Sequence, residues 1–330
     1  MPKTKKQKYA VGVDLGGTNV VVVLMSEAGK VIADTRFSTR ADKGPDFVIK
    51  NISENVKVMI NKAKIEVKDV TKLGIGAPGP LDSKKGIVLV APNMPGWKNI
   101  KLKDDLEKYL KIKAGVENDA NCATFAEKWI GAGKNADNVV GFTLGTGVGG
   151  GIVIDGKLLR GVTNTAAELG HITVELNGRE CGCGSKGCLE TYASATGIAR
   201  TAVEMIKQGR QSIITEMVKG SLSKITSKLV YEALVQKDKL AEEVWISFIR
   251  YLAAGVASVI NVLNPEVIVI AGGVINAGEK LFAPLLDETR KRAFAAPFAA
   301  CKILPAKLGE MAGAIGAAGI VIFEGDYYGI

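Results

Sequence analysis

The hydrophobic positions of this chain follow two periods, and their order along the sequence predicts a mixed α/β protein. The run Val20–Val23 is β-branched throughout, which favours a strand over a helix, and Tyr9–Val13 predicts a partner strand just before it. Later strands are predicted at Leu73–Ala77, Ile112–Val116, Gly149–Ile154 and Val267–Ala271, and around Ile303. Helices are predicted at Asp46–Lys64, Leu102–Leu110, Asn121–Trp129, Phe248–Val262 and Met311–Phe323.

The first predicted hairpin has a counterpart later in the chain. The pairs Val11-Gly12 and Leu15-Gly16 recur as Val140-Gly141 and Leu144-Gly145 with identical internal spacing. Each hairpin is then followed by a polar turn and a further strand. Such an echo indicates two related halves that face each other, although short Gly-Val patterns also recur by chance.

Glycines at the tips of both hairpins indicate phosphate binding. The Walker loop and the dinucleotide fingerprint place a helix after their glycines, whereas here the glycines lead one strand into the next. Glycine lets a backbone approach a phosphate chain closely and adopt positive φ values, so that N–H groups can donate to the phosphates. The candidate residues are the tip glycines, the polar residues beside them and a later strand end: Gly16, Gly17, Thr18, Asn19, Gly145, Thr146, Gly147, Gly272 and Gly273. Asp14 would repel a phosphate, so its expected role is to hold Mg²⁺, directly or through water.

Composition narrows the class of protein. With 330 residues the chain is long enough for about two domains of roughly 150 residues each. Apolar stretches such as Tyr251–Ile260 are shorter than the ~20 residues of a membrane span, so we expect a soluble protein that binds no membrane. The net charge of +9 comes from basic residues spread along the chain, which predicts a solvated surface suited to an anionic substrate and no nucleic-acid partner. Asp14 and Gly16-Gly17 interrupt the first apolar stretch, so no secretory signal is expected and the predicted location is the cytoplasm.

The single histidine and three of the five cysteines lie close together in the sequence. His171, Cys181, Cys183 and Cys188 supply one imidazole and three thiolates, which can close a tetrahedral zinc site with no open position. Such a zinc ion is structural, so the flanking acids are expected to take part in the chemistry. Disulfides are disfavoured because Cys181 and Cys183 are too close to bridge each other and the expected compartment is reducing. An iron–sulfur cluster fits the spacing and the histidine poorly.

A polar motif, Asn118–Asn121, follows the predicted strand Ile112–Val116. Asp119 is the candidate general base, because phosphoryl transfer to an alcohol needs a carboxylate within hydrogen-bond reach of the attacking hydroxyl. The alternative is a helix N-cap, since Asn and Asp are favoured there and a helix is predicted from Asn121. The two roles are compatible.

Six motifs occur in order along the chain: Asp14–Asn19, Gly74–Pro80, Asn118–Asn121, Gly145–Gly147, Glu168–His171 and Cys181–Glu190. Together they resemble the ROK family of repressors, open reading frames and sugar kinases, and most of all its bacterial ATP-dependent glucokinases. The resemblance covers nearly the whole chain, from Tyr9 to near Gly319. Its most specific part is Glu-x-Gly-His with the cysteine segment, whereas Gly-Thr-Gly alone is not specific.

The resemblance implies an actin-like, hexokinase-type fold with two α/β domains around a cleft. Residues 1–118 would form a small domain, completed by the final helix within residues 310–330. Residues 119–309 would form a large domain that carries the zinc loop. A homodimer or homotetramer is also implied.

The resemblance further implies a reaction, the transfer of the γ-phosphoryl group of ATP to the 6-hydroxyl of glucose, with Mg²⁺ and a structural Zn²⁺. Asp119 would take the proton of that hydroxyl. The sugar-binding residues would be Asn118, Asp119, Glu168, His171 and Glu190. One ring nitrogen of His171 would bind zinc while the other faces the sugar, and Gly272-Gly273 would lie near the adenosine.

Other functions of the family stay open at this point. A sugar-responsive repressor carries an N-terminal helix-turn-helix domain, and the few residues before Tyr9 are too short for one, so this function is disfavoured. A kinase for mannose, fructose, allose, N-acetylglucosamine or N-acetylmannosamine is the main alternative. The residues that hold hydroxyls do not decide among these sugars, and they leave ATP, GTP and polyphosphate open as phosphoryl donors.

Overall fold

The computed structural model describes residues 7–91 and 93–323, and these fall into two compact units. Unit 1 takes the described residues up to Gly141, together with Gly151–Ala167 and those from Lys307 onwards. Unit 2 takes Phe142–Gly150 and Glu168–Ala306. These units are defined by packing. The division of the chain at 118/119 and 309/310, which the family resemblance implies, stays a prediction.

Unit 1 is built on a five-stranded sheet with the order β3-β2-β1-β4-β8. Its strands are β1 (Tyr9–Leu15), β2 (Asn19–Ser26), β3 (Val31–Ser38), β4 (Val70–Ala77) and β8 (Lys113–Asn118). β1 is antiparallel to β2, which confirms the first predicted hairpin, and parallel to β4. A small antiparallel sheet adds β5 (Leu81–Asp82), β6 (Ile87–Val90) and β7 (Lys98–Ile100).

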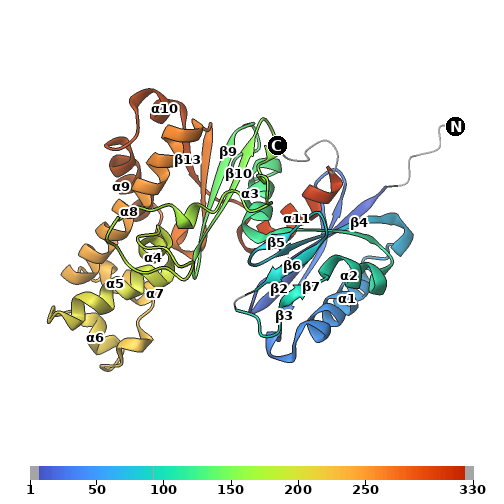
Figure 1. Ribbon diagram of the computed structural model, residues 1–330, viewed down its shortest axis with the longest axis horizontal. Coiled ribbons are helices and arrows are strands. Elements are labelled where there is room, and N and C mark those ends of the chain that lie inside the picture. The colour runs from blue at the N-terminus through green and yellow to red at the C-terminus, as the bar shows by residue number, and fades with distance from the viewer. Residues whose placement is uncertain (1–6, 92, 324–330) are drawn as a thin grey trace. The chain divides into compact units, whose positions relative to one another are not determined.

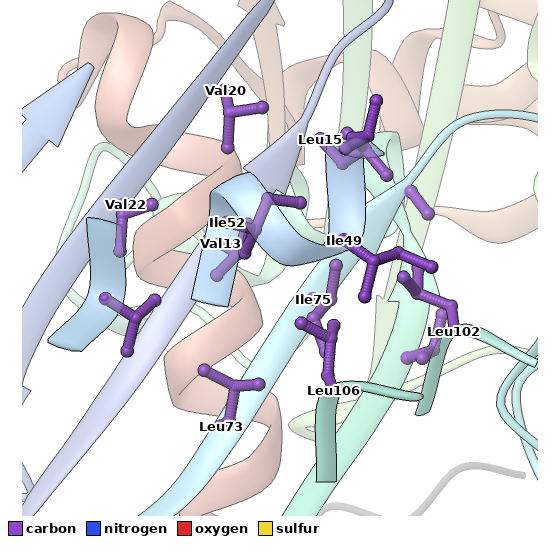
Figure 2. Packing of buried hydrophobic residues seen from close by; sticks show 14 of the residues in the cluster. Val13, Leu15, Val20, Val22, Ile49, Ile52, Leu73, Ile75, Leu102 and Leu106 are labelled. Carbon is purple, nitrogen blue, oxygen red and sulfur yellow. The ribbon is translucent and has the colours of Figure 1, made fainter. Parts of the chain in front are cut away.

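One face of the main sheet is covered by α1 (Pro45–Lys62) and α2 (Leu102–Leu110), as Figure 1 shows. Pro45 begins α1 and Asp46 lies in its first turn, both favourable at a helix N-terminus. Figure 2 shows how the aliphatic side chains of the strands and both helices meet in one apolar core. The labelled members are Val13, Leu15, Val20, Val22, Ile49, Ile52, Leu73, Ile75, Leu102 and Leu106. α2 has the bounds that the sequence predicted.

The opposite face of this sheet is shaped by a row of glycines. Gly12 of β1 pairs with Gly74 of β4, which pairs with Gly115 of β8. The final helix, α11 (Ala312–Ile322), packs on this row so closely that a Cβ at Gly12 or at Gly74 would lie 1.8 Å from a carbonyl oxygen of α11. Only glycine permits such close approach of backbone to backbone. α3 (Asp119–Trp129) packs against α11 in turn, where a Cβ at Gly316 would lie 1.7 Å from the Cys122 carbonyl oxygen.

A second five-stranded sheet has the order β11-β10-β9-β12-β13. Its strands are β9 (Val139–Leu144), β10 (Val148–Ile154), β11 (Lys157–Leu158), β12 (Val267–Ala271) and β13 (Lys302–Pro305). Taken in chain order, both sheets place their strands as third, second, first, fourth and fifth. The matching order agrees with the internal repeat expected from the two hairpins.

Unit 2 takes only part of this sheet, and its other regular elements are helices. Its helices are α4 (Glu190–Ala193), α5 (Ala195–Lys207), α6 (Ile213–Met217), α7 (Ser227–Val235), α8 (Lys239–Leu263), α9 (Glu279–Arg290) and α10 (Ala295–Ala300). α8 begins at Lys239, earlier than the predicted Phe248, because Asp238 caps it and Leu240, Ala241 and Val244 continue its buried face. It ends at Leu263, with Asn264 as its C-cap before Pro265, as the proline predicted.

Among the described residues, α8 is the one helix that is long and apolar enough to cross a membrane, by length and composition. The short apolar stretches found in the sequence did not predict such a helix. Residues such as Leu240, Phe248 and Leu252 are buried, and α8 packs against α5, α7 and α9. This packing accounts for its apolar character, because α8 is the central helix of unit 2.

Candidate active site

The predicted zinc ligands come together in unit 2. The ligand atoms of His171, Cys181, Cys183 and Cys188 all lie within 4.8 Å of one another. The Cys183 and Cys188 sulfur atoms are 3.7 Å apart, and Cys181 Sγ is 3.6 Å from His171 Nδ1. A tetrahedral zinc ion with Zn–S bonds of about 2.3 Å has edges of roughly 3.8 Å, so the four residues fit this metal.

The electrostatics of the three thiols also favour a cation. Burial, together with hydrogen bonds that the Cys188 thiol donates to the neighbouring sulfurs, raises the pKa of Cys188 to about 12, and burial raises the pKa of Cys181. The pKa of Cys183 is lowered, mainly by the backbone N–H of Ser185. Three thiolates this close repel one another, and a metal ion removes that cost because it binds them in the deprotonated form.

The loop that carries the three cysteines, Cys181–Cys188, is also held by Arg179, which the sequence analysis did not single out. The Arg179 guanidinium donates to the Thr191 carbonyl at 2.6 Å and to the Thr201 hydroxyl at 2.9 Å, and it pairs with Glu204. It also lies 4.6 Å from the centre of the Tyr192 ring. Arg179 therefore ties the loop before the cysteines to the start of α4 and to α5.

His171 connects the metal cluster to one of the predicted sugar-binding acids. Its Nδ1 faces Cys181, while its Nε2 lies 3.9 Å from a Glu168 carboxylate oxygen. The two ring nitrogens therefore face different groups, and the division of His171 between metal and sugar stays a prediction. The Glu168 side chain is 56% exposed and open to a ligand.

Glu190, the second predicted sugar-binding acid, contacts the tip of the second hairpin. Its Oε2 accepts a 2.9 Å hydrogen bond from the backbone N–H of Val148. A Cβ at Gly147 would lie 2.2 Å from the same oxygen, so a larger residue there would have to displace the Glu190 carboxylate. The sequence placed Glu190 with the sugar and Gly147 with the phosphates, and the structure brings these two residues into contact.

A pocket of about 540 Å³ lies beside the second hairpin in unit 2. Its walls combine aromatic and small residues with a few polar side chains: Leu144, Gly145, Thr146, Ala195, Ser227, Lys228, Tyr231, Trp245, Gly273, Val274, Asn276 and Ala277. Gly272, next to it, has φ 102°, and a Cβ there would lie 2.0 Å from the Leu144 carbonyl oxygen. This volume and this mostly apolar lining are typical of a site for a small organic ligand.

The tip of the first hairpin, in unit 1, is closed by backbone hydrogen bonds. Gly16 N–H donates to the Asn19 carbonyl at 3.0 Å, and Thr39 N–H donates to the Thr18 carbonyl at 2.9 Å. The expectation of positive φ at the hairpin glycines is wrong, because Gly16, Gly17, Gly145 and Gly147 are not among the described glycines with positive φ. A Cβ would be crowded at Gly16, 2.9 Å from the Asn19 carbonyl oxygen, and at Gly147, whereas at Gly17 and Gly145 it would meet nothing closer than 3.7 Å.

Asp14, at the end of β1, lies against the first turn of α11, since a Cβ at Gly313 would meet its carboxylate at 2.4 Å. Burial, and to a lesser degree the negative charge of Asp119, raises the pKa of Asp14 to about 7. An acid that is costly to ionise and lies near a second acid gains from a bound cation. This fits the predicted Mg²⁺ role, as carboxylate oxygens suit that ion.

α3 begins within the Asn118–Asn121 motif, for which a helix cap and a general base are predicted. Asn118 is the N-cap, and its side-chain oxygen accepts from the backbone N–H groups of Ala120 and Asn121. Asp119 is the first residue of the helix, and its carboxylate accepts from Ala120 N–H at 2.8 Å. The capping interpretation is therefore confirmed for Asn118, whereas the role of Asp119 as general base stays a prediction.

The structure adds a buried ion pair that the sequence analysis missed. Arg160 Nε donates to Glu117 Oε2 at 2.7 Å, and both side chains are almost fully buried. A sign was present in the sequence, because Glu117 continues the buried strand directly before Asn118. Its partner lies 43 residues away and no local pattern indicates it.

Each unit therefore collects its own share of the predicted site. Asp14, the first hairpin tip, Asn118 and Asp119 belong to unit 1. The second hairpin tip, the zinc ligands, Glu168, Glu190 and Gly272-Gly273 belong to unit 2. The duplicated sheets, their glycine hairpins and the residues around them define an actin-like ATPase fold that carries a cluster of three cysteines and one histidine.

Comparisons with known proteins support this class and identify the family. Residues 10–324 match the ROK family, and the chain belongs to it. It is 40% identical to the glucokinase of Thermotoga maritima over 97% of this chain and 98% of that protein. It is 28% identical to the xylose repressor of Caldicellulosiruptor bescii, and this match covers 95% of this chain but 78% of the repressor.

A solved structure extends the similarity to three dimensions. The ROK family glucokinase of Streptomyces griseus, in complex with glucose and AMPPNP, matches with a TM-score of 0.77 and 34% identity. The match covers 94% of this chain and 98% of that chain. The predicted family and the predicted actin-like fold are both confirmed.

Proposed function

We propose that this protein is a glucokinase that transfers the γ-phosphoryl group of ATP to the 6-hydroxyl of glucose, giving glucose 6-phosphate and ADP. The observation that carries the proposal is the full-length similarity to a glucokinase, at 40% identity. A similar solved structure, at 34% identity, contains glucose and an ATP analogue. The repressor relatives are more distant, at 28% identity.

In this proposal Asp119 is the general base. Its carboxylate accepts the proton of the sugar 6-hydroxyl while that oxygen forms a bond to the γ-phosphorus and the bond to the ADP oxygen breaks. Asp119 is the first residue of α3, and the Asn118 side chain caps the first turn of this helix. This position supports the role of Asp119. The Asp119 side chain is thereby presented by a rigid element, which favours a reactive geometry.

The sugar hydroxyls are assigned to Asn118, Glu168, His171 and Glu190. Carboxylates are strong acceptors for hydroxyl donors, and the 56% exposure of the Glu168 side chain leaves it accessible. The zinc ion would be held by the three cysteines and His171, and it would restrain the loop without reacting itself. The contact of His171 with both the sulfurs and Glu168 supports the assignment.

The nucleotide is assigned to the glycine hairpins and the pocket beside the second one. The phosphates would receive backbone N–H groups at the two hairpin tips, with Thr18, Asn19 and Thr146 as further donors. Asp14 would hold Mg²⁺, which neutralises charge on the transferring group. The pocket lined by Tyr231 and Trp245, next to Gly272-Gly273, suits the apolar faces of the adenosine.

The setting of the enzyme follows from the same family. The protein is soluble, and we propose that it acts in the cytoplasm, where thiols stay reduced and available to zinc. A homodimer or homotetramer is proposed from the family resemblance. Sedimentation of the zinc-loaded protein at several concentrations tests this, and a monomer at every concentration would contradict it.

A panel of sugars in a coupled assay of ADP release tests the reaction. Glucose, mannose, fructose, allose, N-acetylglucosamine and N-acetylmannosamine are offered in turn with ATP, and ATP alone serves as the control. We expect the highest kcat/KM with glucose and negligible ADP release without a sugar. A higher kcat/KM with another hexose would reassign the substrate, and no phosphorylation of any sugar would overturn the proposal.

A further inference from the structure

The buried ion pair of Glu117 and Arg160 adjoins the proposed base directly in the chain. The Arg160 side chain is 9% exposed and that of Glu117 is 4% exposed. Burial of two charges costs several kcal/mol per ion, so a pair kept in this position is weak evidence for stability alone. The question is which neighbouring groups the pair orders.

The Glu117 carboxylate accepts hydrogen bonds from three different directions. Oε1 accepts from the backbone N–H of Asn118 at 3.0 Å and from the Asn121 side-chain amide at 3.1 Å. Oε2 accepts from Arg160 at 2.7 Å. These contacts lie on both sides of Asp119 in the sequence, one on the residue before it and one in the helical turn after it. The carboxylate therefore restrains the backbone from which Asp119 projects.

Arg160 connects a second segment of unit 1 to the Glu117 carboxylate. Its carbonyl oxygen accepts from Ala166 N–H at 3.0 Å, and Gly161 after it has φ 67°. This turn closes the stretch of chain that leads directly to Glu168, a proposed sugar-binding residue. One arginine thus contacts the strand before the proposed base and closes the turn before a proposed sugar ligand.

We propose that Glu117 and Arg160 are a positioning pair for the phosphoryl transfer, which holds the Asn118-Asp119 turn in the geometry that the reaction requires. The inference rests on the proposed function, because it assumes that Asp119 acts as the base. Neither residue touches the reacting atoms. A misplacement of about 1 Å can cost 10²-fold in rate, so loss of the pair affects kcat more than nucleotide binding.

A matched residue separates positioning from a structural role. Glu127 lies on α3, the helix that begins at Asp119, and is as buried as Glu117. Its carboxylate accepts from the backbone N–H groups of Ala132, Lys307 and Leu308 at 2.7–2.8 Å. These donors lie at and beyond the other end of α3 from Asp119. The Glu127→Gln variant therefore removes a buried carboxylate of the same helix without disturbing the Asn118-Asp119 turn.

The test compares three variants of the full chain with zinc bound. Arg160→Lys keeps the charge but loses the planar guanidinium. The double variant Glu117→Gln/Arg160→Met removes both charges together and so avoids one unpaired buried ion. Glu127→Gln is the control. Thermal unfolding is measured for each variant, and kcat and KM are then compared well below the lowest Tm.

We expect kcat to fall about 10-fold in Arg160→Lys and about 100-fold in the double variant, with the KM for ATP within twofold of wild type. Glu127→Gln is expected to lose stability while its kcat stays within twofold. The inference is overturned if kcat stays within twofold in both pair variants, or if kcat falls equally in Glu127→Gln. Wild-type protein that phosphorylates no hexose would overturn the proposed function and this inference with it.

Discussion

The two glycine hairpins occupy the same place in two sheets of the same strand order, yet their tips have different surroundings. Beside the first hairpin, β1–β2, lies Asp14 with a raised pKa and a second acid, Asp119, close enough to contribute to that shift. Beside the second hairpin, β9–β10, Glu190 binds the backbone of the tip and an aromatic-lined pocket opens.

This difference shows that the shared topology sets where each hairpin tip lies in its sheet. Individual residues beside each tip then determine the chemistry of that tip. Gly12 and Gly141 are equivalent in the two patterns, and each packs against a helix, Gly12 against α11 and Gly141 against Thr124 of α3. The scaffold contacts are therefore shared. The proposed general base, Asp119, and the proposed magnesium site belong to the first repeat. The predicted zinc ligands and the pocket proposed for the adenosine belong to the second.

The largest expected effect tests the first repeat as the site of chemistry. Asp119→Asn keeps the shape of the side chain but removes the proton acceptor, so we expect kcat to fall by roughly 10³-fold or more while glucose affinity changes less than 10-fold. Stopped assays give kcat, and calorimetry gives the affinity. Asp137→Asn, an exposed acid in the same unit, is the matched control. Near-normal turnover in Asp119→Asn would remove it from the role of base.

The next effect tests the second repeat as the site of binding. Removal of zinc by chelation, or Cys188→Ser, is expected to weaken glucose binding 10- to 100-fold because the loop that presents His171 and Glu168 loses its restraint. Binding of AMPPNP should change less than threefold. Calorimetry with each ligand measures both, and Cys301→Ser is the control outside the cluster. Unchanged glucose affinity in zinc-free protein would break the link between metal and sugar.

A smaller effect compares two glycines within the second hairpin tip. A Cβ at Gly145 would meet nothing within 4 Å, whereas a Cβ at Gly147 would lie 2.2 Å from the Glu190 carboxylate. Gly145→Ala should therefore leave Tm unchanged and raise only the KM for ATP, by about 5-fold. Gly147→Ala should displace Glu190 and raise the KM for both ATP and glucose, by about 10-fold. Equal kinetics for the two variants would contradict the proposed contact between sugar site and phosphate site.

The smallest expected effect is a pH dependence that arises at Asp14. Its pKa is raised from 3.8 to about 7, so the folded state disfavours the ionised carboxylate. The resulting loss of stability is absent below the unfolded pKa and is complete above the folded one. Asp14→Asn should therefore raise Tm by about 3–5 °C at pH 8.5 in magnesium-free buffer and leave it unchanged near pH 4. The same gain at both pH values would show that ionisation is not its cause.

Much of the fold could be predicted because its signals are local. The β-branched run of β2, the bounds of α2 and the stop of α8 before Pro265 follow from periodicity and from proline chemistry within a few residues. The zinc ligands lie within one short stretch, so their spacing was sufficient to propose the site. The glycine hairpins were recognised correctly, although Gly16, Gly17, Gly145 and Gly147 lack positive φ and only Gly16 and Gly147 among them have a neighbour within 3 Å of a Cβ position.

The sequence by itself determined many of the elements, the candidate metal ligands and the family to which the chain belongs. Only the tertiary structure decided that α11 lies on the glycine row of Gly12, Gly74 and Gly115. It also decided that Glu117 meets Arg160 and that Glu190 meets the second hairpin. The physical reason is that periodicity and turn chemistry act over a few residues, whereas close packing and the pairing of buried charges join segments far apart in the chain.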